Sequence, residues 1–171
     1  MIEIINKFIQ GGIMTVFSVK EVLEMAVQTE KLGAEFYTNM AARFGGNEEF
    51  RKLFEMLAEQ EREHENIFHS IMEKMGSSYQ MPENWGEAAK YLRAIVESEF
   101  FLGDGKVLPN FEHLKTADDV INYAITFEKV TLLFYIELRD IVDDKEAVYN
   151  LINEEKGHIV WLSDYRKKLK V

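Results

Sequence analysis

Four long stretches of this sequence carry hydrophobic residues at alternating spacings of three and four, which places the side chains on one face of a helix. Only two prolines occur in 171 residues, and the stretches are rich in Glu, Lys, Leu, Met and Ala. These residues favour helices over strands. With 47% hydrophobic residues, the chain is long enough to bury one substantial core. The sequence therefore predicts a single all-α domain.

Capping residues mark the ends of the first two predicted helices. Ser18, followed three residues later by Glu21, forms a capping box at the start of the first helix, and Gly45-Gly46 ends it. Asn47 begins the second helix, which is expected to run to about Met75. The short connection between them predicts an antiparallel hairpin.

A second hairpin is predicted in the C-terminal half. Its first helix begins near Thr116 and ends around Val142, and Asp143, with Glu146 three residues later, begins the last helix. The connection between the hairpins, residues 76–115, contains both prolines and a shorter helical stretch over 86–101. A connection of this length predicts a crossover along a four-helix bundle.

The hydrophobic face of each predicted helix is interrupted near its middle by a glutamate. In chain order the four faces are Val19, Leu23, Ala26, Glu30, Gly33 and Tyr37; Phe50, Phe54, Leu57, Glu61, His64, Phe68 and Ile71; Ile121, Ala124, Glu128, Thr131, Tyr135 and Leu138; and Val148, Leu151, Glu155, His158, Leu162 and Tyr165. An unpaired carboxylate in a bundle core loses its hydration, so it takes up a proton or finds a cation. Four glutamates at a similar depth also repel one another, and bridging divalent cations relieve that repulsion.

Two of these glutamates are followed three residues later by a histidine, in Glu61–His64 and Glu155–His158. This spacing places both side chains on one helical face, where they can bind the same metal. One Glu from each of two helices and Glu-x-x-His from each of the other two is the ligand set of di-iron carboxylate bundles. The predicted metal ligands are Glu30, Glu61, His64, Glu128, Glu155 and His158. Oxygen and imidazole ligands suit iron or manganese.

A coincidental pattern is the alternative for any one of these residues. Glutamate occupies 23 of 171 positions, so a single Glu-x-x-His pair carries little weight. Two such pairs among four histidines, both on hydrophobic faces, favour the metal site. His69 and His113 have no such partners, and we expect them at the surface.

The sequence also repeats itself. It reads AVQTEKLGAEFY around Glu30 and AITFEKVTLLFY around Glu128, with Ala, Glu-Lys and Phe-Tyr in register. This repeat predicts a duplicated hairpin, each copy supplying half of one dinuclear centre. Tyr37 and Tyr135 occupy equivalent positions, where we expect core packing with the hydroxyls bonded to the carboxylates; a redox role is the alternative.

Composition excludes several other classes of protein. The chain has no cysteine, which rules out disulfides, thiolate metal sites and cysteine nucleophiles. Its net charge of −10 argues against a nucleic-acid partner. The apolar N-terminal stretch is too short to span a bilayer and lacks the features of a signal peptide, which predicts a cytoplasmic protein. We expect residues 1–17 to form an N-terminal arm or to result from a start codon assigned too far upstream. Residues 18–171 are expected to form the domain.

The segments TEKLGAEFY, LAEQEREHENIF, FEKVTLLFY and INEEKGHIVWL resemble the metal-binding helices of the rubrerythrin-like branch of the ferritin-like superfamily. The resemblance implies a ferritin-like four-helix bundle that holds two iron ions, with manganese or a mixed Fe/Mn pair as alternatives. It also implies a homodimer that reacts with hydrogen peroxide or dioxygen, as a peroxidase or ferroxidase, or with ferrous iron. Carried over by position, Glu30, Glu61 and His64 match one half-site; Glu128, Glu155 and His158 match the other.

Two departures from that branch narrow the expectation. Rubrerythrin proper carries a cysteine-ligated iron as an electron relay, so this cysteine-free chain would need a separate electron donor. Thr131 stands where rubrerythrin has an additional metal-binding glutamate, and Glu97 or Glu99 in the crossover is the candidate replacement. An iron-binding or storage protein that assembles into a cage, or a metal-stabilised scaffold without turnover, are the alternative functions.

Overall fold

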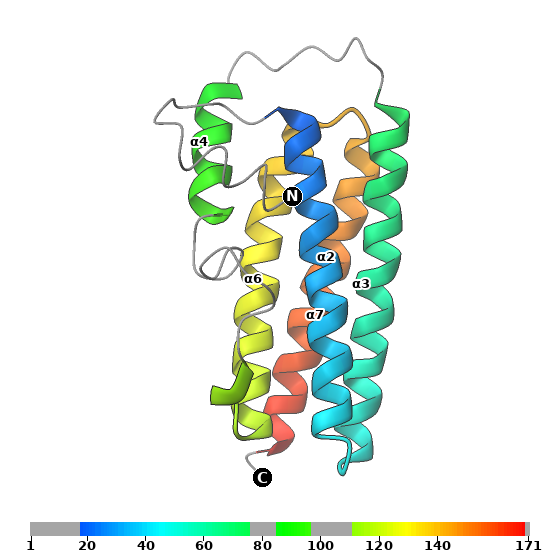
Figure 1. Cartoon of the computed structure of the whole chain (residues 1–171), viewed down its shortest axis with the longest axis vertical. Coiled ribbons are helices and arrows are strands. Elements are labelled where there is room, and N and C mark those ends of the chain that lie inside the picture. The colour runs from blue at the N-terminus through cyan, green and yellow to red at the C-terminus, as the bar shows by residue number, and fades with distance from the viewer. Residues whose placement is uncertain (1–17, 76–84, 97–110, 170–171) are drawn as a thin grey trace.

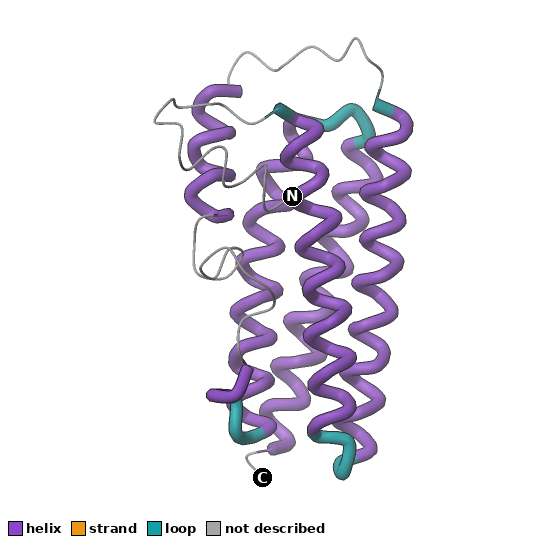
Figure 2. The backbone as a smooth tube through the Cα atoms, in the orientation of Figure 1, coloured by secondary structure: helices purple, strands orange, loops and turns teal. Residues whose placement is uncertain are grey.

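The computed structural model describes residues 18–75, 85–96 and 111–169. The predicted arm and both candidate crossover ligands, Glu97 and Glu99, lie outside these residues. Within them the chain forms five α-helices and a short 3-10 helix (Figures 1 and 2). The elements are α2 (Val19–Arg43), α3 (Glu48–Lys74), α4 (Trp85–Val96), η2 (Phe111–His113), α6 (Ala117–Ile141) and α7 (Lys145–Leu169).

The four long helices form the bundle, as two hairpins side by side (Figure 1). Helix α2 pairs with α3 and α6 pairs with α7, and the hairpins meet where α2 contacts α6 and α3 contacts α7. Figure 1 shows α3 and α6 running in the same direction, so the chain must return along the bundle between them. Helix α4 lies on this return and contacts α6 from outside the bundle. The predicted all-α architecture of two hairpins and a crossover helix is confirmed.

Capping confirms the predicted starts of three helices. The Ser18 hydroxyl accepts a hydrogen bond from the backbone amide of Glu21. In return, the Glu21 carboxylate accepts one from the backbone amide of Ser18, and the two bonds form the capping box of α2. Asn47 caps α3, and Thr116 forms a second capping box with Asp119 at α6. These contacts satisfy backbone N–H groups that have no partner within the helix.

The predicted start of the fourth helix at Asp143 is wrong by one residue. The Asp144 side chain accepts from the Ala147 amide at 3.2 Å, and the Asp144 carbonyl accepts from the Val148 amide. Asp144 also pairs with Lys74 at the end of α3, with an N–O distance of 3.2 Å. Either aspartate can cap a helix, so this tertiary contact favours the second.

The hydrophobic core is divided into two clusters along the bundle. One contains Leu23, Phe68, Leu138 and Leu151, and the other contains Phe50, Phe54, Ile121 and Leu162. All the residues predicted on the four faces are buried. The predicted glutamates fall in sequence between the two clusters on every helix, so a polar layer separates two apolar ones. Among the described residues, no helix has the length and hydropathy needed to cross a membrane.

Candidate metal centre

The structure brings all six predicted metal ligands together at the middle of the bundle. Each of these side chains is at most 1% exposed, although all are polar or ionisable. They come from all four long helices: Glu30 from α2, Glu61 and His64 from α3, Glu128 from α6, and Glu155 and His158 from α7. Because each helix holds a rigid register, the spacing of three within α3 and α7 directs glutamate and histidine to the same place.

The six residues form two overlapping groups of candidate ligands. One group is Glu30, Glu61, His64 and Glu155, and the other is Glu61, Glu128, Glu155 and His158. In each group the donor atoms lie within 4.8 Å of one another. Glu61 and Glu155 belong to both groups. Each group thus takes three residues from one hairpin and one glutamate from the other, whereas the sequence had assigned three residues to each half.

Both histidines turn the same ring nitrogen inward. His64 Nδ1 lies 2.9 Å from a Glu155 oxygen and 3.6 Å from a Glu30 oxygen. His158 Nδ1 lies 3.4 Å from Glu155 and 3.5 Å from Glu61 and from Glu128. The two rings are stacked nearly parallel, with centroids 5.4 Å apart and an interplanar angle of 15°. Nδ1 is therefore the nitrogen through which each histidine can reach a cation.

The donor atoms fit divalent cations. Each of the six residues leaves at least one buried oxygen or nitrogen without a hydrogen-bond partner among the described residues. Unpaired polar atoms of this kind are costly in a protein interior. Donor atoms about 2.1 Å from one cation lie about 3.0 Å apart at right angles and about 4.2 Å apart when opposite. The distances around His64 and His158 fall in or near this interval.

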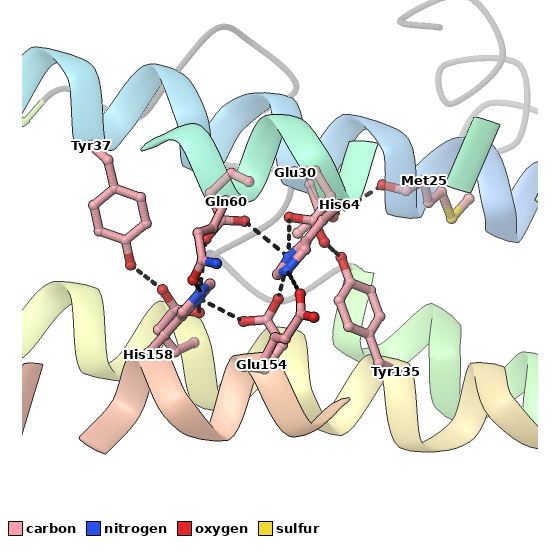
Figure 3. A network of polar contacts seen from close by, with 12 residues as sticks. Met25, Glu30, Tyr37, Gln60, His64, Tyr135, Glu154 and His158 are labelled. Carbon is pink, nitrogen blue, oxygen red and sulfur yellow. Dashed lines mark hydrogen bonds and ion pairs between the residues drawn. The ribbon is translucent and has the colours of Figure 1, made fainter. Parts of the chain in front are cut away.

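Two buried tyrosines tie the carboxylates across the bundle (Figure 3). The Tyr37 hydroxyl on α2 donates to Glu128 on α6, and the Tyr135 hydroxyl on α6 donates to Glu30 on α2. The expected hydroxyl contacts are therefore present, but each tyrosine reaches the glutamate of the opposite hairpin. The pKa of both tyrosines is raised well above 10.0, first by burial and then by the neighbouring carboxylates, so both hydroxyls stay protonated and can donate.

The sequence did not predict two further residues that contact the site. His64 Nε2 lies 2.8 Å from an oxygen of Glu154 on α7, and His158 Nε2 lies 2.9 Å from Oε1 of Gln60 on α3 (Figure 3). Each residue directly precedes a site glutamate, one position off the buried face. Both residues directly precede the glutamate of a Glu-x-x-His pair, and this equivalent place is the one sequence signal that marks them.

Burial and crowding disturb the ionisation of the carboxyl groups. Burial, then the charges of Glu30 and Glu128, raise the pKa of Glu61 well above its usual 4.5. Burial and Glu155 raise the pKa of Glu128 to about 8, against the opposing effect of His158. Burial acts the same way on Glu155, but the neighbouring imidazoles of His158 and His64 outweigh it and lower the pKa of this group. Without cations, the centre therefore retains protons on carboxyl groups near neutral pH.

The histidines carry the compensating charge. Burial lowers the pKa of His64, but Glu155 and Glu30 more than offset this and raise it to about 11. Burial also opposes the charge on His158, whose pKa rises to about 10 because of Glu128 and Glu155. Metal binding requires a free Nδ1 lone pair and ionised carboxylates, so it must displace these protons.

The structure also places the other two histidines and the residues one turn after Glu30 and Glu128. His69 and His113 are exposed, as predicted. Thr131, at the position of the additional family glutamate, is fully buried, and its hydroxyl has no hydrogen-bond partner among the residues described. Gly33 occupies the equivalent place one turn after Glu30.

Alanine at Gly33 should weaken metal binding. A Cβ there would lie 3.2 Å from Cδ of Glu61 and 3.1 Å from Cε1 of Phe127, closer than ordinary contacts. The Glu61 carboxylate must then shift by a few tenths of an ångström from the position that both groups share. We expect the Mn²⁺ affinity to fall several-fold in calorimetric titration.

Gly157→Ala is the matched control, because its Cβ would meet Trp161 only at 3.9 Å. Both substitutions remove a helical glycine, which favours the helix by up to about 1 kcal/mol. Gly157→Ala should therefore keep the wild-type affinity. Equal affinities in both variants would contradict the role assigned to Gly33.

The chain was compared with known families and structures. Residues 21–102 match the family model described as Rubrerythrin. This match covers most of α2 and all of α3 and α4, and includes Glu30, Glu61 and His64. No curated protein gives a significant match.

A crystal structure from Thermotoga maritima, described as that of a ferritin-like diiron-carboxylate protein, has a similar fold. The superposition has a TM-score of 0.64 with 24% sequence identity, and it covers 91% of this chain and 98% of the other. It therefore extends the likeness over both hairpins. These findings confirm the predicted resemblance: the chain has the ferritin-like fold, and its residues 21–102, which carry the first half of the carboxylate and histidine cluster, match the Rubrerythrin family model.

Proposed function

We propose that this protein is a non-haem di-iron oxidoreductase of rubrerythrin-like type that reacts with hydrogen peroxide or dioxygen. The observation that carries the proposal is the pair of overlapping ligand groups that share Glu61 and Glu155. In this assignment, Glu30 and His64 would hold one metal, Glu128 and His158 would hold the other, and Glu61 and Glu155 would contribute to both positions. Oxygen and imidazole donors suit iron, with manganese or a mixed pair as alternatives.

The reduced metal pair, when bound, would supply the two electrons that reduce hydrogen peroxide to water. The protein fixes the distance between the two positions through Glu61 and Glu155, and Tyr37 and Tyr135 orient the terminal carboxylates. All six ligands are at most 1% exposed, which excludes bulk water and restricts the substrate to small molecules such as peroxide and dioxygen.

A separate protein would return electrons to the centre, because the chain has no cysteine to hold an additional iron as a relay. We further propose that the protein acts as a homodimer, as the rubrerythrin resemblance implies, and that it is cytoplasmic, as predicted from its N-terminal sequence. Size-exclusion chromatography with light scattering tests the dimer, and a shell of many subunits would instead support the storage alternative.

The activity is tested with protein loaded anaerobically with ferrous iron and mixed rapidly with hydrogen peroxide. We expect oxidation much faster than that of free ferrous ion, with about one peroxide consumed for each pair of irons. Glu155→Gln should abolish the fast phase, while Glu63→Gln, which removes an exposed carboxylate two residues from Glu61, should preserve it. Wild-type oxidation no faster than that of the free ion, with either peroxide or dioxygen, would overturn the proposal.

A further inference from the structure

The outward-facing nitrogens of the two histidines have different partners. His64 Nε2 meets the carboxylate of Glu154 at 2.8 Å, whereas His158 Nε2 meets the amide oxygen of Gln60 at 2.9 Å. Both contacts are made by Nε2, whereas Nδ1 of each ring faces the carboxylate cluster. One histidine is thus held by an acidic group and the other by a neutral one.

The contrast occurs at equivalent positions. Gln60 directly precedes Glu61 on α3, and Glu154 directly precedes Glu155 on α7. Each reaches the histidine of the opposite hairpin, just as each tyrosine reaches the opposite glutamate. Both histidines face one terminal glutamate and the shared pair, although the His158 ring also lies beside Trp161, with centroids 5.7 Å apart. The difference in charge between the two partners therefore distinguishes the two halves of the centre.

A carboxylate partner makes the inward nitrogen a better donor. An ionised carboxylate can only accept, so once a metal ion displaces the proton on Nδ1 of His64, the remaining proton lies on Nε2 and the Nδ1 lone pair faces the metal. The negative acceptor polarises the ring and raises the basicity of Nδ1, an effect that commonly changes metal affinity 10–100-fold. A neutral amide accepts the same hydrogen bond without this charge. The Glu154 side chain is 45% exposed, so solvent screens it and the lower end of this range applies.

We propose that Glu154 and Gln60 are positioning residues that make the two metal positions unequal, so that the position between Glu30 and His64 takes up a divalent cation before the position between Glu128 and His158. This inference rests on the proposed function only in requiring that the centre binds two metal ions. The ligand types are the same at both positions, so they do not by themselves predict which position fills first. The partners of the two histidines do.

Anaerobic Mn²⁺ titration followed by calorimetry tests the order, together with crystals grown with one equivalent of Mn²⁺. Wild-type protein should show two binding steps at least about tenfold apart in affinity. Its anomalous difference peak should be stronger beside His64. Glu154→Gln, which keeps an oxygen acceptor but removes the charge, should weaken the first step about tenfold and bring the two steps together.

The reciprocal variant makes the test independent of any single substitution. Gln60→Glu should strengthen the second step about tenfold, and the double variant Gln60→Glu/Glu154→Gln should move the stronger anomalous peak beside His158. Glu63→Gln removes an exposed carboxylate that does not contact either histidine, and it should leave both steps unchanged. Circular dichroism verifies that each variant is folded.

The outcomes separate this inference from the proposed function. Two ions bound with equal affinity and equal peaks, or a first step unaffected by Glu154→Gln, would overturn the inference and leave a di-metal centre intact. An order that persists in the double variant would assign the asymmetry to other residues and also overturn it. Failure to bind two ions at all would overturn both.

Discussion

Substitution of Glu61 by glutamine should remove both metal ions, whereas Glu30→Gln and Glu128→Gln should each leave about one per chain. Glu61 belongs to both ligand groups, while Glu30 and Glu128 each belong to one. An amide cannot supply the anionic oxygens that join two cations, so the loss of Glu61 affects both positions. Metal analysis after dialysis against trace Mn²⁺ or ferrous iron measures the difference.

The fold of the Glu61→Gln variant should be preserved. Burial and the neighbouring glutamates raise the pKa of Glu61 and so favour its neutral form in the metal-free protein, and a glutamine side chain closely resembles a neutral carboxylic acid. We therefore expect the free energy of unfolding of the metal-free variant to stay within about 1 kcal/mol of wild type. Glu63→Gln controls for loss of a charge on α3. A Glu61→Gln protein that retains two ions would refute the bridging assignment.

The metal-free protein should become less stable as the pH rises from about 5 to 9, while bound metal should restore stability increasingly over the same range. The pKa of Glu128 rises from 4.5 in the unfolded chain to about 8 in the fold. A group whose pKa is higher in the folded state than in the unfolded chain stabilises the fold fully at pH values below its unfolded-state pKa. This contribution is lost as the pH rises through its folded-state pKa. His64 and His158, raised from 6.5 to about 11 and about 10, act with the same sign at higher pH.

Urea unfolding at several pH values, with chelator or with saturating Mn²⁺, measures this divergence. The loss in the metal-free protein should be large enough to lower the urea midpoint clearly, because Glu128 and both histidines release protons on unfolding within this range and each displaced proton contributes about 1.4 kcal/mol per pH unit. Glu128→Gln cannot titrate at this position, so its metal-free form should show a shallower decline. A metal-free stability that rises between pH 5 and 9 would contradict the protonation pattern derived for the centre.

Local sequence signals predicted the helices and their faces. Ser18, Asn47 and Thr116 satisfy backbone amides within three residues, so their effect depends little on the rest of the fold. The four hydrophobic faces follow from the helical repeat, and every residue assigned to them is buried. The same periodicity placed the glutamates and histidines at one depth. Local signals alone did not predict the first residue of α7, because the choice of its capping residue depends on the distant Lys74.

The sequence by itself therefore determined the four helices, their buried faces and the six residues that meet between them, because each depends on spacing along one helix. Only the tertiary structure decided which glutamates are shared, which hydroxyl reaches which carboxylate, and that Gln60 and Glu154 contact the histidines. These contacts all cross from one hairpin to the other. Their geometry depends on how the two hairpins pack against each other, and the periodicity of residues within one helix does not predict this packing.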